Sequence, residues 1–518
     1  MNETPSHLDA NIAALGPKAR ELAPLLTQNL PAEVELRAAR TGQPTLACNG
    51  LCLHSQYDPK REARRFAERA GVGRGDYVLL YGFGLGYQAE ALAEHLGDDG
   101  ELVVLELNCA VLSAAFHARD LRPLLSRPNV WLVAAASEPE AAAAFHDVLT
   151  GVFDAVPPER QHVLIHTPSL AVAPAGYERI VNALEVIQIE RSAATVHRDF
   201  SMQNLVSNLD AVLASPGVAE VLPVLNGQAA FLVSAGPSLD EALPHLAQFQ
   251  HRAWIVSVDT VYEALRRRGI VPDFVVSIDP QPTSAEHFGF EPGAHGTLIF
   301  FPTSAREVIE RFPGRTVVAV QTGHSIVSVV EELFGEKGGT ASGGSAACVA
   351  LDLAVRYGVT RLFFVGQDCA FPEWKVYSAN LARNRQWLHH VNRFTSLEML
   401  HRAAAAAAKV VYVTDRYGAP IPTHQNLYSY LRELERIVEA NPACEFYNFF
   451  SRGASIGGVR AVQLVEEVDQ LLPTDIEKRW DAAPTVPCDS LRQEILGRLG
   501  DAFGDAAACS PGGARVSR

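Results

Sequence analysis

A stretch rich in hydrogen-bond donors begins where an apolar run that starts at Phe231 is followed by Gly236-Pro237-Ser238. The run predicts a buried strand, and leucines at helical spacing after Ser238 predict a helix directly behind the turn. A glycine lets a ligand approach the backbone, Ser238 is a typical N-cap, and a helix start offers N–H groups and a positive dipole end. The turn therefore predicts an anion site, although the same pattern also fits a plain tight turn.

A second donor-rich turn runs from Gly338 to Ser345 and precedes a predicted helix over Ala346–Tyr357. Its glycines and hydroxyls, among them Ser342 and Gly343, suit a phosphate at a helix N-terminus. The turn lacks the lysine of a Walker loop, so the sequence does not support a P-loop nucleotidase.

Polar residues follow several predicted strands of the same region. Ligands of open parallel sheets bind beyond the carboxyl ends of the strands, so these residues predict one site for a nucleotide diphosphate or a monophosphate sugar. Strand-end acids also cap helices, and that alternative stays open for each of them. The residues in question are Gly236, Asp259, Asp279, Thr303, Gln321, Gln367, Asp368 and, one loop further on, Tyr377.

A separate glycine turn, with Gly82, Gly84 and Gly86, follows the predicted strand Tyr77–Tyr81, and the next strand ends on Glu106. This layout is that of a nucleotide-binding βαβ unit, in which the acid accepts ribose hydroxyls. The spacing is closer to an S-adenosylmethionine methyltransferase turn than to a dinucleotide turn. The alternative is a structural unit with an empty pocket.

The helices and strands expected around these residues indicate an α/β protein. It would have two Rossmann-like parallel-sheet domains, a helical linker and C-terminal helices. We expect an N-terminal domain at 1–170, a connector at 171–215, a central domain at 216–472 and a C-terminal helix with a flexible tail at 473–518. Smaller expectations are a charged helix from Asp58-Pro59 to Gly71, and helices over Leu397–Ala408, Leu427–Glu439 and Ala461–Leu472.

Composition excludes several classes of protein. The 518 residues are 48% hydrophobic and 20% charged, as in ordinary globular proteins, and the net charge of −15 argues against nucleic acid as a partner. No apolar run approaches the roughly 20 residues that span a bilayer, and the first ten residues do not resemble a signal peptide. The eight cysteines are scattered. We therefore expect a cytoplasmic protein without a membrane span, a disulfide framework or a zinc site.

The ordered motifs resemble a known family. Gly236-Pro-Ser-Leu-Asp240, Pro272-Asp273 with Ser277-Ile-Asp279, Ser342-Gly343, and Gly366-Gln-Asp368 followed by Tyr377 resemble the motility accessory factor family of flagellin glycosyltransferases. The 6-hydroxymethylpterin diphosphokinases, or MptE-like proteins, share its core domain. Further matches to the C-terminal portion of that family are Tyr417-Gly418, Pro422-Thr423 and the stretch Arg452–Gly458.

This resemblance implies a function. The family core is similar to bacterial sialyltransferases, which implies a CMP-activated nonulosonic acid, such as pseudaminic or legionaminic acid, as the donor. Flagellin Ser or Thr hydroxyls would be the acceptors, and no tightly bound cofactor is expected. The resemblance places Gly236, Pro237, Ser238 and Asp259 against the nucleotide, Ser342 and Gly343 against the cytidine monophosphate, and Tyr377 near its phosphate, with Gln367 also lining the site.

Transfer of such a sugar needs hydrogen bonds to the departing phosphate and a base for the acceptor hydroxyl. The sequence has no Asp-x-Asp metal motif at a strand end, so we expect departure without a metal. Asp368, Asp279 and His424 are the candidate catalytic residues, with His324 as a further candidate base; the pattern does not choose among them.

Other functions remain open at this point. A pterin diphosphokinase would use ATP and a magnesium ion held by acids such as Asp259, Asp279 and Asp368. A non-catalytic flagellin-binding factor would keep the fold with a degenerate pocket. A methyltransferase role for residues 71–135 is the fourth hypothesis.

Overall fold

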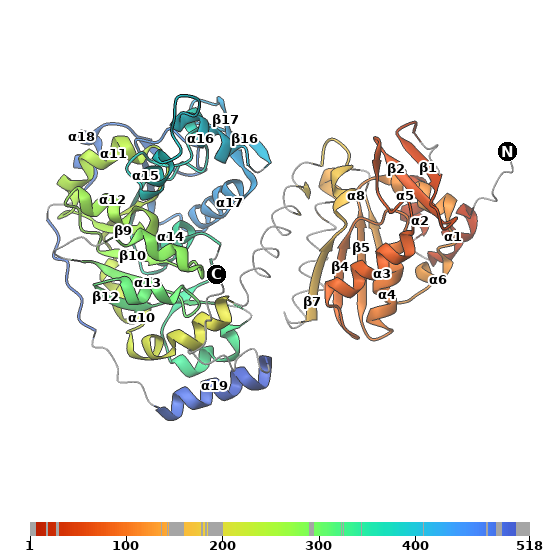
Figure 1. Ribbon diagram of the computed structural model, residues 1–518, viewed down its shortest axis with the longest axis horizontal. Coiled ribbons are helices and arrows are strands. Elements are labelled where there is room, and N and C mark those ends of the chain that lie inside the picture. Colours follow the sequence, from red (N-terminus) through yellow and green to blue (C-terminus); the bar gives the residue numbers. More distant parts are fainter. Residues whose placement is uncertain are drawn as a thin grey trace. The chain divides into compact units, whose positions relative to one another are not determined.

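The computed structural model describes residues 7–16, 19–26, 31–135, 137–141, 143, 160–177, 180–181, 184, 200–289, 295–322, 324, 326–342, 344–407, 409–472, 475–482 and 489–503. The chain divides into two compact units, residues 1–191 and 192–518, and each contains a parallel sheet with helices (Figure 1). The predicted α/β class is therefore confirmed. Within the predicted connector, 171–215, residues 178–179, 182–183 and 185–199 lie outside the described residues.

Unit 1 is built on a four-stranded parallel sheet in the order β6-β5-β4-β7. Its strands are β4 (Tyr77–Tyr81), β5 (Glu101–Glu106), β6 (Val130–Ala134) and β7 (Gln161–Ile165). A small antiparallel sheet joins β1 (Val34–Ala38), β2 (Pro44–Cys48) and β3 (Leu51–Cys52). The helices are α1 (Leu8–Ala14), α2 (Ala19–Leu26), α3 (Pro59–Ala70), α4 (Tyr87–Leu96), α5 (Cys109–Ala118), α6 (Arg122–Leu125) and α8 (Thr167–Ala171).

The start and end of α3 follow from its sequence. The Oδ1 atom of Asp58 accepts a hydrogen bond of 3.0 Å from the N–H of Arg61, Pro59 occupies the first turn, and Gly71 ends the helix with a φ of 65°. Aspartate caps and proline at the first position favour a helix start, and a left-handed residue at the end favours glycine. The predicted charged helix is confirmed.

Unit 2 is built on an eight-stranded parallel sheet in the order β12-β11-β10-β9-β8-β15-β18-β19. Its strands are β8 (Ala229–Val233), β9 (Trp254–Val258), β10 (Phe274–Ser277), β11 (Thr297–Phe300), β12 (Arg315–Val318), β15 (Arg361–Val365), β18 (Glu445–Phe449) and β19 (Arg460–Val462). Smaller pairs are β13 (Val320–Gln321) with β14 (Gly339–Thr340), and β16 (Val410–Thr414) with β17 (Pro420–His424).

The helices of unit 2 lie around this sheet (Figure 1). They are α10 (Val218–Val221), α11 (Leu239–Leu246), α12 (Tyr262–Arg267), α13 (Arg306–Arg311), α14 (Ala346–Arg356), α15 (Ala382–Leu388), α16 (Leu397–Ala405), α17 (Gln425–Ala440), α18 (Val465–Leu471) and α19 (Asp489–Phe503). The prediction of one helix over Ala461–Leu472 is partly wrong, because Arg460–Val462 form edge strand β19 and the helix begins only at Val465. The Val462 side chain is fully buried, and strand pairing overrides helix propensity there.

The core of unit 2 ties the central strands together. Strand β8 is buried along its whole length, as expected for a parallel strand covered on both faces. An aromatic series crosses three neighbouring strands: the rings of Phe231 and Phe363 lie 5.1 Å apart, and those of Phe363 and Tyr447 lie 5.0 Å apart. Rings stacked across β8, β15 and β18 hold the strand ends, and the loops that follow them, in a fixed register.

Among the described residues, no helix is both long enough and apolar enough to cross a bilayer. The six described cysteines are all free thiols, so no disulfide joins any pair of them.

Candidate active site at the strand switch point

The site begins where the strand order of the large sheet changes direction. β8 lies between β9, which follows it in the chain, and β15, which comes much later. Strands β9 to β12 extend the sheet on one side of β8. Strands β15, β18 and β19, which come later in the chain, extend it on the other side. In open α/β sheets such a switch point leaves a crevice beyond the carboxyl ends of the strands, and ligands bind there. The loops after β8 and β15 carry the residues predicted from the sequence.

Ser238 and Asp368 join these two loops. The backbone N–H of Ser238 donates to Oδ2 of Asp368 at 2.8 Å, and the Ser238 hydroxyl donates to Oδ1 of the same carboxylate. Both side chains are almost completely buried, at 2% exposure each. The structure therefore brings together two predicted site residues that are 130 positions apart in the chain.

Two expectations about this turn are wrong in detail. The Ser238 side chain makes no capping bond to α11, because its hydroxyl donates to Asp368 instead. The space over Gly236 is also filled by the protein: a Cβ there would lie 2.3 Å from Oδ2 of Asp368 and 2.6 Å from the carbonyl oxygen of Gly366. Glycine is required at 236 so that a carboxylate of the chain itself, rather than a ligand, can approach the backbone.

Burial raises the pKa of the Asp368 carboxyl to about 7, against the opposing effect of backbone N–H donors from Ser238, Arg452 and Gly453. Desolvation penalises the charged form of an acid, and hydrogen bonds from N–H groups favour it. Here desolvation dominates. Asp368 therefore changes its charge near neutral pH while it holds the turn.

The loop that carries Tyr377 is hydrogen-bonded to the Ser238 turn through the next residue, Ser378. The N–H of Ser378 donates to the carbonyl oxygen of Ala235 at 3.0 Å, and the Ser378 hydroxyl donates to Asp240 in the first turn of α11. Asp240 also accepts from the side-chain amide of Asn380 at 2.8 Å. The half-buried ring of Tyr377 lies 6.4 Å from that of Trp387. The Tyr377 loop is thus bonded to Ala235, the residue before Gly236, and to Asp240 in α11.

The second donor-rich turn lies at the same edge of the sheet. Helix α14 precedes the parallel strand β15 and packs on β8, β9 and β10, so its N-terminus points toward the carboxyl ends of the strands. No side chain caps its first turn, which leaves N–H groups and the positive dipole end for an anion. Ser342 lies just before this helix at 2% exposure, and its hydroxyl has no hydrogen-bond partner in the described part of the chain. Gly343 lies outside the described residues.

Two further buried polar atoms near the switch point have no protein partner among the described residues. They are Oγ of Ser234, directly after β8, and Oε1 of Gln367, directly after β15. Nε2 of Gln367 donates to the Cys369 sulfur at 3.1 Å, so the amide oxygen is the group left over. Buried polar atoms rarely stay unpaired in native proteins, and such groups are explained by a bound ligand or water.

The acids after β9 and β10 form a separate pair on the other side of β8. Asp259 accepts the Ser277 hydroxyl and the Thr260 N–H, each at 2.7 Å, and burial raises its pKa. Oδ1 of Asp279 accepts the N–H of Gln281 at 2.8 Å, and Asp279 is only half-buried. Asp259 is thus fully engaged within the protein, whereas Asp279 keeps an oxygen with no protein partner in the described part.

Two other residues, Thr303 and Gln321, were also predicted to lie at strand ends. The carbonyl oxygen of Thr303 accepts from the side chain of Asn204 at 3.1 Å, which is a structural contact. Gln321 does not follow a strand of the main sheet, because β12 ends at Val318 and Gln321 lies in the small β13–β14 pair.

The candidate histidines have structural partners. Nδ1 of His424 accepts the N–H of Leu427 at 3.2 Å and caps α17, and burial lowers the pKa of this ring. Nδ1 of His324 accepts the N–H of Ile326 at 3.3 Å, and burial lowers its pKa too. A neutral imidazole that accepts at Nδ1 carries its proton on Nε2, so neither ring offers a free basic nitrogen in this arrangement.

Arg452 and Gly453 reach the site although spacing alone did not select them. The N–H of Ala454 donates to the Asp368 carbonyl oxygen at 2.7 Å, and a Cβ on Gly453 would lie 2.2 Å from that oxygen. The Arg452 guanidinium forms ion pairs with Glu241 and, at 3.5 Å, with Glu373. The Arg452–Gly458 stretch was noted only as a family match, since no local pattern connects it to Asp368.

The glycine turn of unit 1 is filled by the chain itself. Glu106, fully buried after β5, accepts the N–H groups of Phe83 at 2.9 Å and Gly84 at 3.3 Å. A Cβ on Gly84 would lie 2.5 Å from Nε2 of His54, and one on Gly82 would lie 2.6 Å from Cβ of Ser169. Gly86 is similarly close to Leu121 and Phe83, at 3.0 Å each. A nucleotide at this predicted second turn would require these side chains to move.

No group of three or more His, Cys, Asp or Glu side chains placed to hold a metal ion occurs in the part of the chain that the structure describes.

Residues 203–373, which span β8 to β15 and the segment through Asp368, match the family described as 6-hydroxymethylpterin diphosphokinase MptE-like. This segment of the chain is similar to the MptE-like family. The recognition of this core from its ordered motifs is confirmed. The MptE-like match covers the Ser238 turn, the Asp259 and Asp279 strand ends and the α14 N-terminus, and it ends before Tyr377.

Two curated relatives come from Treponema pallidum (strain Nichols), and both are described as uncharacterized proteins. The first is 26% identical over 232 residues, which is 43% of this chain and 75% of the relative. The second is 30% identical over 132 residues, or 24% of this chain and 61% of the relative.

A solved structure of the MAf glycosyltransferase from Magnetospirillum magneticum AMB-1 is also similar, at 16% identity and a TM-score of 0.43, over 97% of this chain and 80% of that chain. A TM-score below 0.5 does not establish a shared fold.

Proposed function

We propose that this chain is a glycosyltransferase that moves a nonulosonic sugar, of the pseudaminic or legionaminic kind, from a CMP donor to Ser or Thr hydroxyls of flagellin and so supports flagellar assembly. The observation that carries the proposal is the meeting of three motif segments at one switch point. These are the Ser238 turn, the Gly366–Asp368 loop and the N-terminus of α14. Their order along the chain is that of the flagellin glycosyltransferases which the sequence resembles.

In this proposal the phosphate of the donor lies at the N-terminus of α14. The first N–H groups of the helix, the helix dipole and the unpartnered Ser342 hydroxyl supply donors to the oxygen that becomes charged as CMP departs. The unpartnered oxygen of Gln367 accepts from the cytosine amine or a ribose hydroxyl. Donors that are fixed before the reaction stabilise developing charge without reorganisation.

The reaction breaks the bond between the anomeric carbon and the phosphate oxygen, and CMP leaves with the electron pair. A new bond forms from the acceptor hydroxyl oxygen to the same carbon, and the hydroxyl proton passes to a base. Of the three predicted catalytic residues, Asp368 is buried and bonded to Ser238, and His424 caps a helix. Asp279 is half-buried and has an oxygen without a protein partner in the described part. We therefore assign Asp279 the role of general base for the acceptor hydroxyl.

Asp368 then acts as a positioning residue. Its carboxylate holds the Ser238 turn through two hydrogen bonds and fixes the distance between the β8 and β15 loops. The Tyr377 loop is attached to the same turn through Ser378, which supports the proposed role of the tyrosine near the departing phosphate.

The test combines ligand binding with transfer. A ligand that binds only the folded state raises the melting temperature, so CMP in the presence of EDTA is expected to stabilise the chain. Ser342→Ala is expected to weaken that stabilisation, whereas the control Glu439→Gln, at an exposed position on α17, should leave it unchanged. Incubation with CMP-pseudaminic acid and flagellin is expected to add one sugar mass per modified hydroxyl. The absence of both the CMP shift and the mass gain would refute the proposal.

A diphosphokinase is the second candidate, because the matched family is described by that activity. It predicts stabilisation by ATP only with magnesium, and pyrophosphoryl transfer to a hydroxymethylpterin. Asp259, Asp279 and Asp368 would have to turn toward the metal, and Asp259 would give up its bonds to Ser277 and Thr260. If no nucleotide stabilises the chain but flagellin still binds, the non-catalytic binding factor replaces both enzymes.

A further inference from the structure

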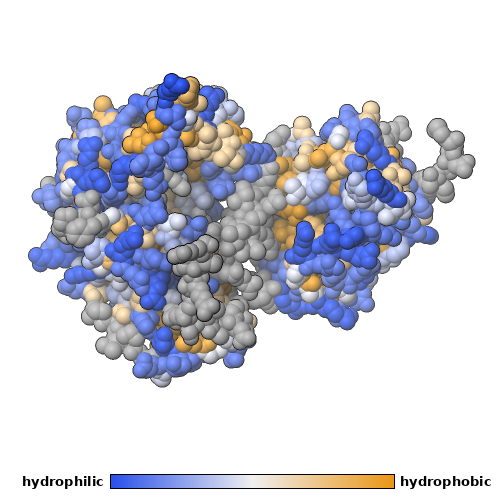
Figure 2. Space-filling view, viewed as in Figure 1, coloured by the Kyte–Doolittle hydropathy of each residue, from blue (hydrophilic) through white to orange (hydrophobic). Residues whose placement is uncertain are grey.

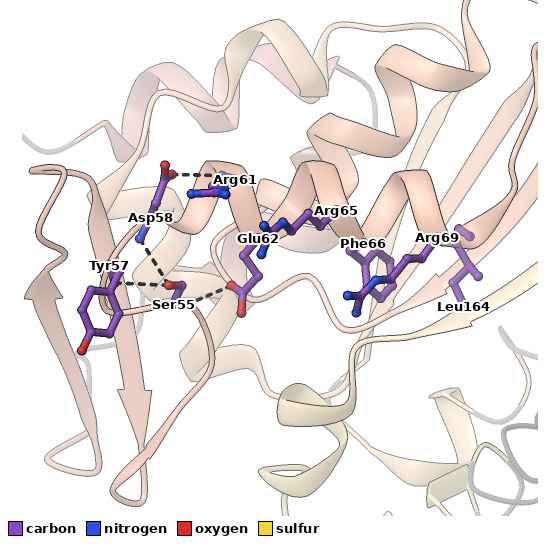
Figure 3. Close-up of a pocket in the computed structure, with 10 residues that line it drawn as sticks. Ser55, Tyr57, Asp58, Arg61, Glu62, Arg65, Phe66, Arg69 and Leu164 are labelled. Atoms are coloured by element: carbon purple, nitrogen blue, oxygen red, sulfur yellow. Dashed lines mark hydrogen bonds between the residues drawn. The ribbon is translucent and has the colours of Figure 1, made fainter.

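A hollow of about 670 Å³ lies on unit 1. One side of α3 forms its wall, the segment Ser55–Asp58 closes one end, and Phe66, Ala70 and Leu164 line the other end (Figure 3). This volume is in the range of ligand-binding clefts. We call it the α3 groove.

Three arginines follow one another along the groove. Arg61, Arg65 and Arg69 are spaced four residues apart, so they share one face of α3 and their backbone positions are about 6 Å apart along the axis (Figure 3). All three are exposed, and none forms an ion pair in the described part of the chain. Like charges at this spacing destabilise a helix, so the arrangement favours a role outside the helix itself.

The acids of the groove do not neutralise these arginines. Asp58 caps α3 through the N–H of Arg61, and Glu62 accepts the N–H of Ser55 at 2.8 Å. Five of the twelve residues of α3 are Lys or Arg and two are Glu, in a chain whose net charge is −15. Figure 2 shows a strongly hydrophilic surface over α3.

We propose that the α3 groove binds an acidic polypeptide segment in an extended conformation. Side chains on one face of a strand recur about every 6.7 Å, which matches the step of about 6 Å between successive arginines. Three alternate carboxylates can therefore each face one guanidinium, whose planar fork suits a carboxylate. The Phe66, Ala70 and Leu164 end of the groove receives an apolar side chain that follows the acidic residues.

The length of the arginine row and the cover over one aromatic ring favour a short peptide over a nucleic acid. The row of arginines is only about 12 Å long, so it can face about three anionic groups. Single-stranded nucleic acids bind largely through bases stacked on open aromatic faces. Tyr57 lines the groove, and the guanidinium of Arg40 lies 4.6 Å from the centre of its ring and covers one of its faces.

The experiment is a fluorescence anisotropy titration of the full chain with a labelled Glu-Val-Glu-Val-Glu-Val-Leu peptide, whose Leu lies on the same face as the three Glu, in about 50 mM salt, where exposed charges are weakly screened. The Arg65→Gln/Arg69→Gln variant is expected to weaken binding about tenfold, as the loss of two exposed ion pairs implies. Lys60→Gln/Arg64→Gln is the matched control, because it removes two charges of the same helix that do not line the groove. All four side chains are exposed. Melting curves that match wild type would show that both variants are folded.

The outcomes separate the alternatives. Binding that falls in the groove variant, stays within twofold of wild type in the control, and is absent for the Gln-Val-Gln-Val-Gln-Val-Leu peptide supports the proposal. Equal losses in both variants show only diffuse charge attraction and overturn it, as does the absence of peptide binding. An oligouridine that binds more tightly than the peptide, and loses affinity in the same groove variant, would replace the peptide by a nucleic acid.

Discussion

Asp368→Asn tests whether the carboxyl beneath the Ser238 turn titrates near neutral pH. The side chain is 2% exposed, and burial raises its pKa from 3.8 to about 7. An acid whose pKa is higher in the folded state contributes stability that is complete below pH 3.8 and is lost as the pH rises toward 7, because the folded state holds its proton longer. Asparagine has nearly the same shape but does not ionise.

The size of the effect follows from that shift. A difference of about three pKa units corresponds to about 4 kcal/mol in the free energy of unfolding. The difference in stability between Asp368→Asn and wild type should therefore move by about this amount, in favour of the variant, between pH 4 and pH 7. The Ser238 hydroxyl can turn to accept a hydrogen bond from the new amide, so the turn keeps its two contacts.

The assay is urea unfolding of the full chain at several pH values, followed on the transition of unit 2 and expressed as variant minus wild type. Subtraction removes the titration of all other groups, including those of unit 1. Glu439→Gln, an exposed position on α17, is the matched control and should give a curve parallel to wild type. A parallel curve for Asp368→Asn as well would show that burial does not raise this pKa, and the reasoning would fail.

Four further outcomes are expected. Gly236→Ala should destabilise unit 2 by about 2–4 kcal/mol in urea unfolding, because its Cβ would lie 2.3 Å from the Asp368 carboxylate; a loss below about 0.5 kcal/mol would contradict the close approach. Asp279→Asn should lower the transfer rate about 100-fold or more while the CMP-induced melting shift stays, and unchanged transfer would remove it as the base. His424→Asn, which can still cap α17, should retain transfer within a few-fold in the same assay. Burial lowers the pKa of His166 to about 4, so wild type should lose about 3 kcal/mol relative to His166→Gln as the pH falls from 6.5 to 4, measured on the unit 1 transition.

Much of the architecture could be predicted from local pattern. Largely apolar runs such as Trp254–Val258 and Arg361–Val365 are strands in the structure, since a parallel strand covered on both faces is mostly apolar. Asp58-Pro59 and Gly71 marked the ends of α3 because capping is a local property. The helix predicted from Ala461 wrongly includes Ala461 and Val462, since strand β19 exists only through pairing with β18.

The sequence by itself determined the order of the motifs and the type of chemistry available, because glycine turns, hydroxyls and strand-end acids are properties of single residues and short spacings. The tertiary structure decided which of these groups are used by the protein itself. Asp368 bonds to Ser238 across 130 positions, and Glu106 fills the glycine turn of its own unit. Such pairings depend on strand order, which no local spacing records. Strand order therefore left Ser234, Ser342, Gln367 and Asp279 among the described residues that keep an atom without a protein partner.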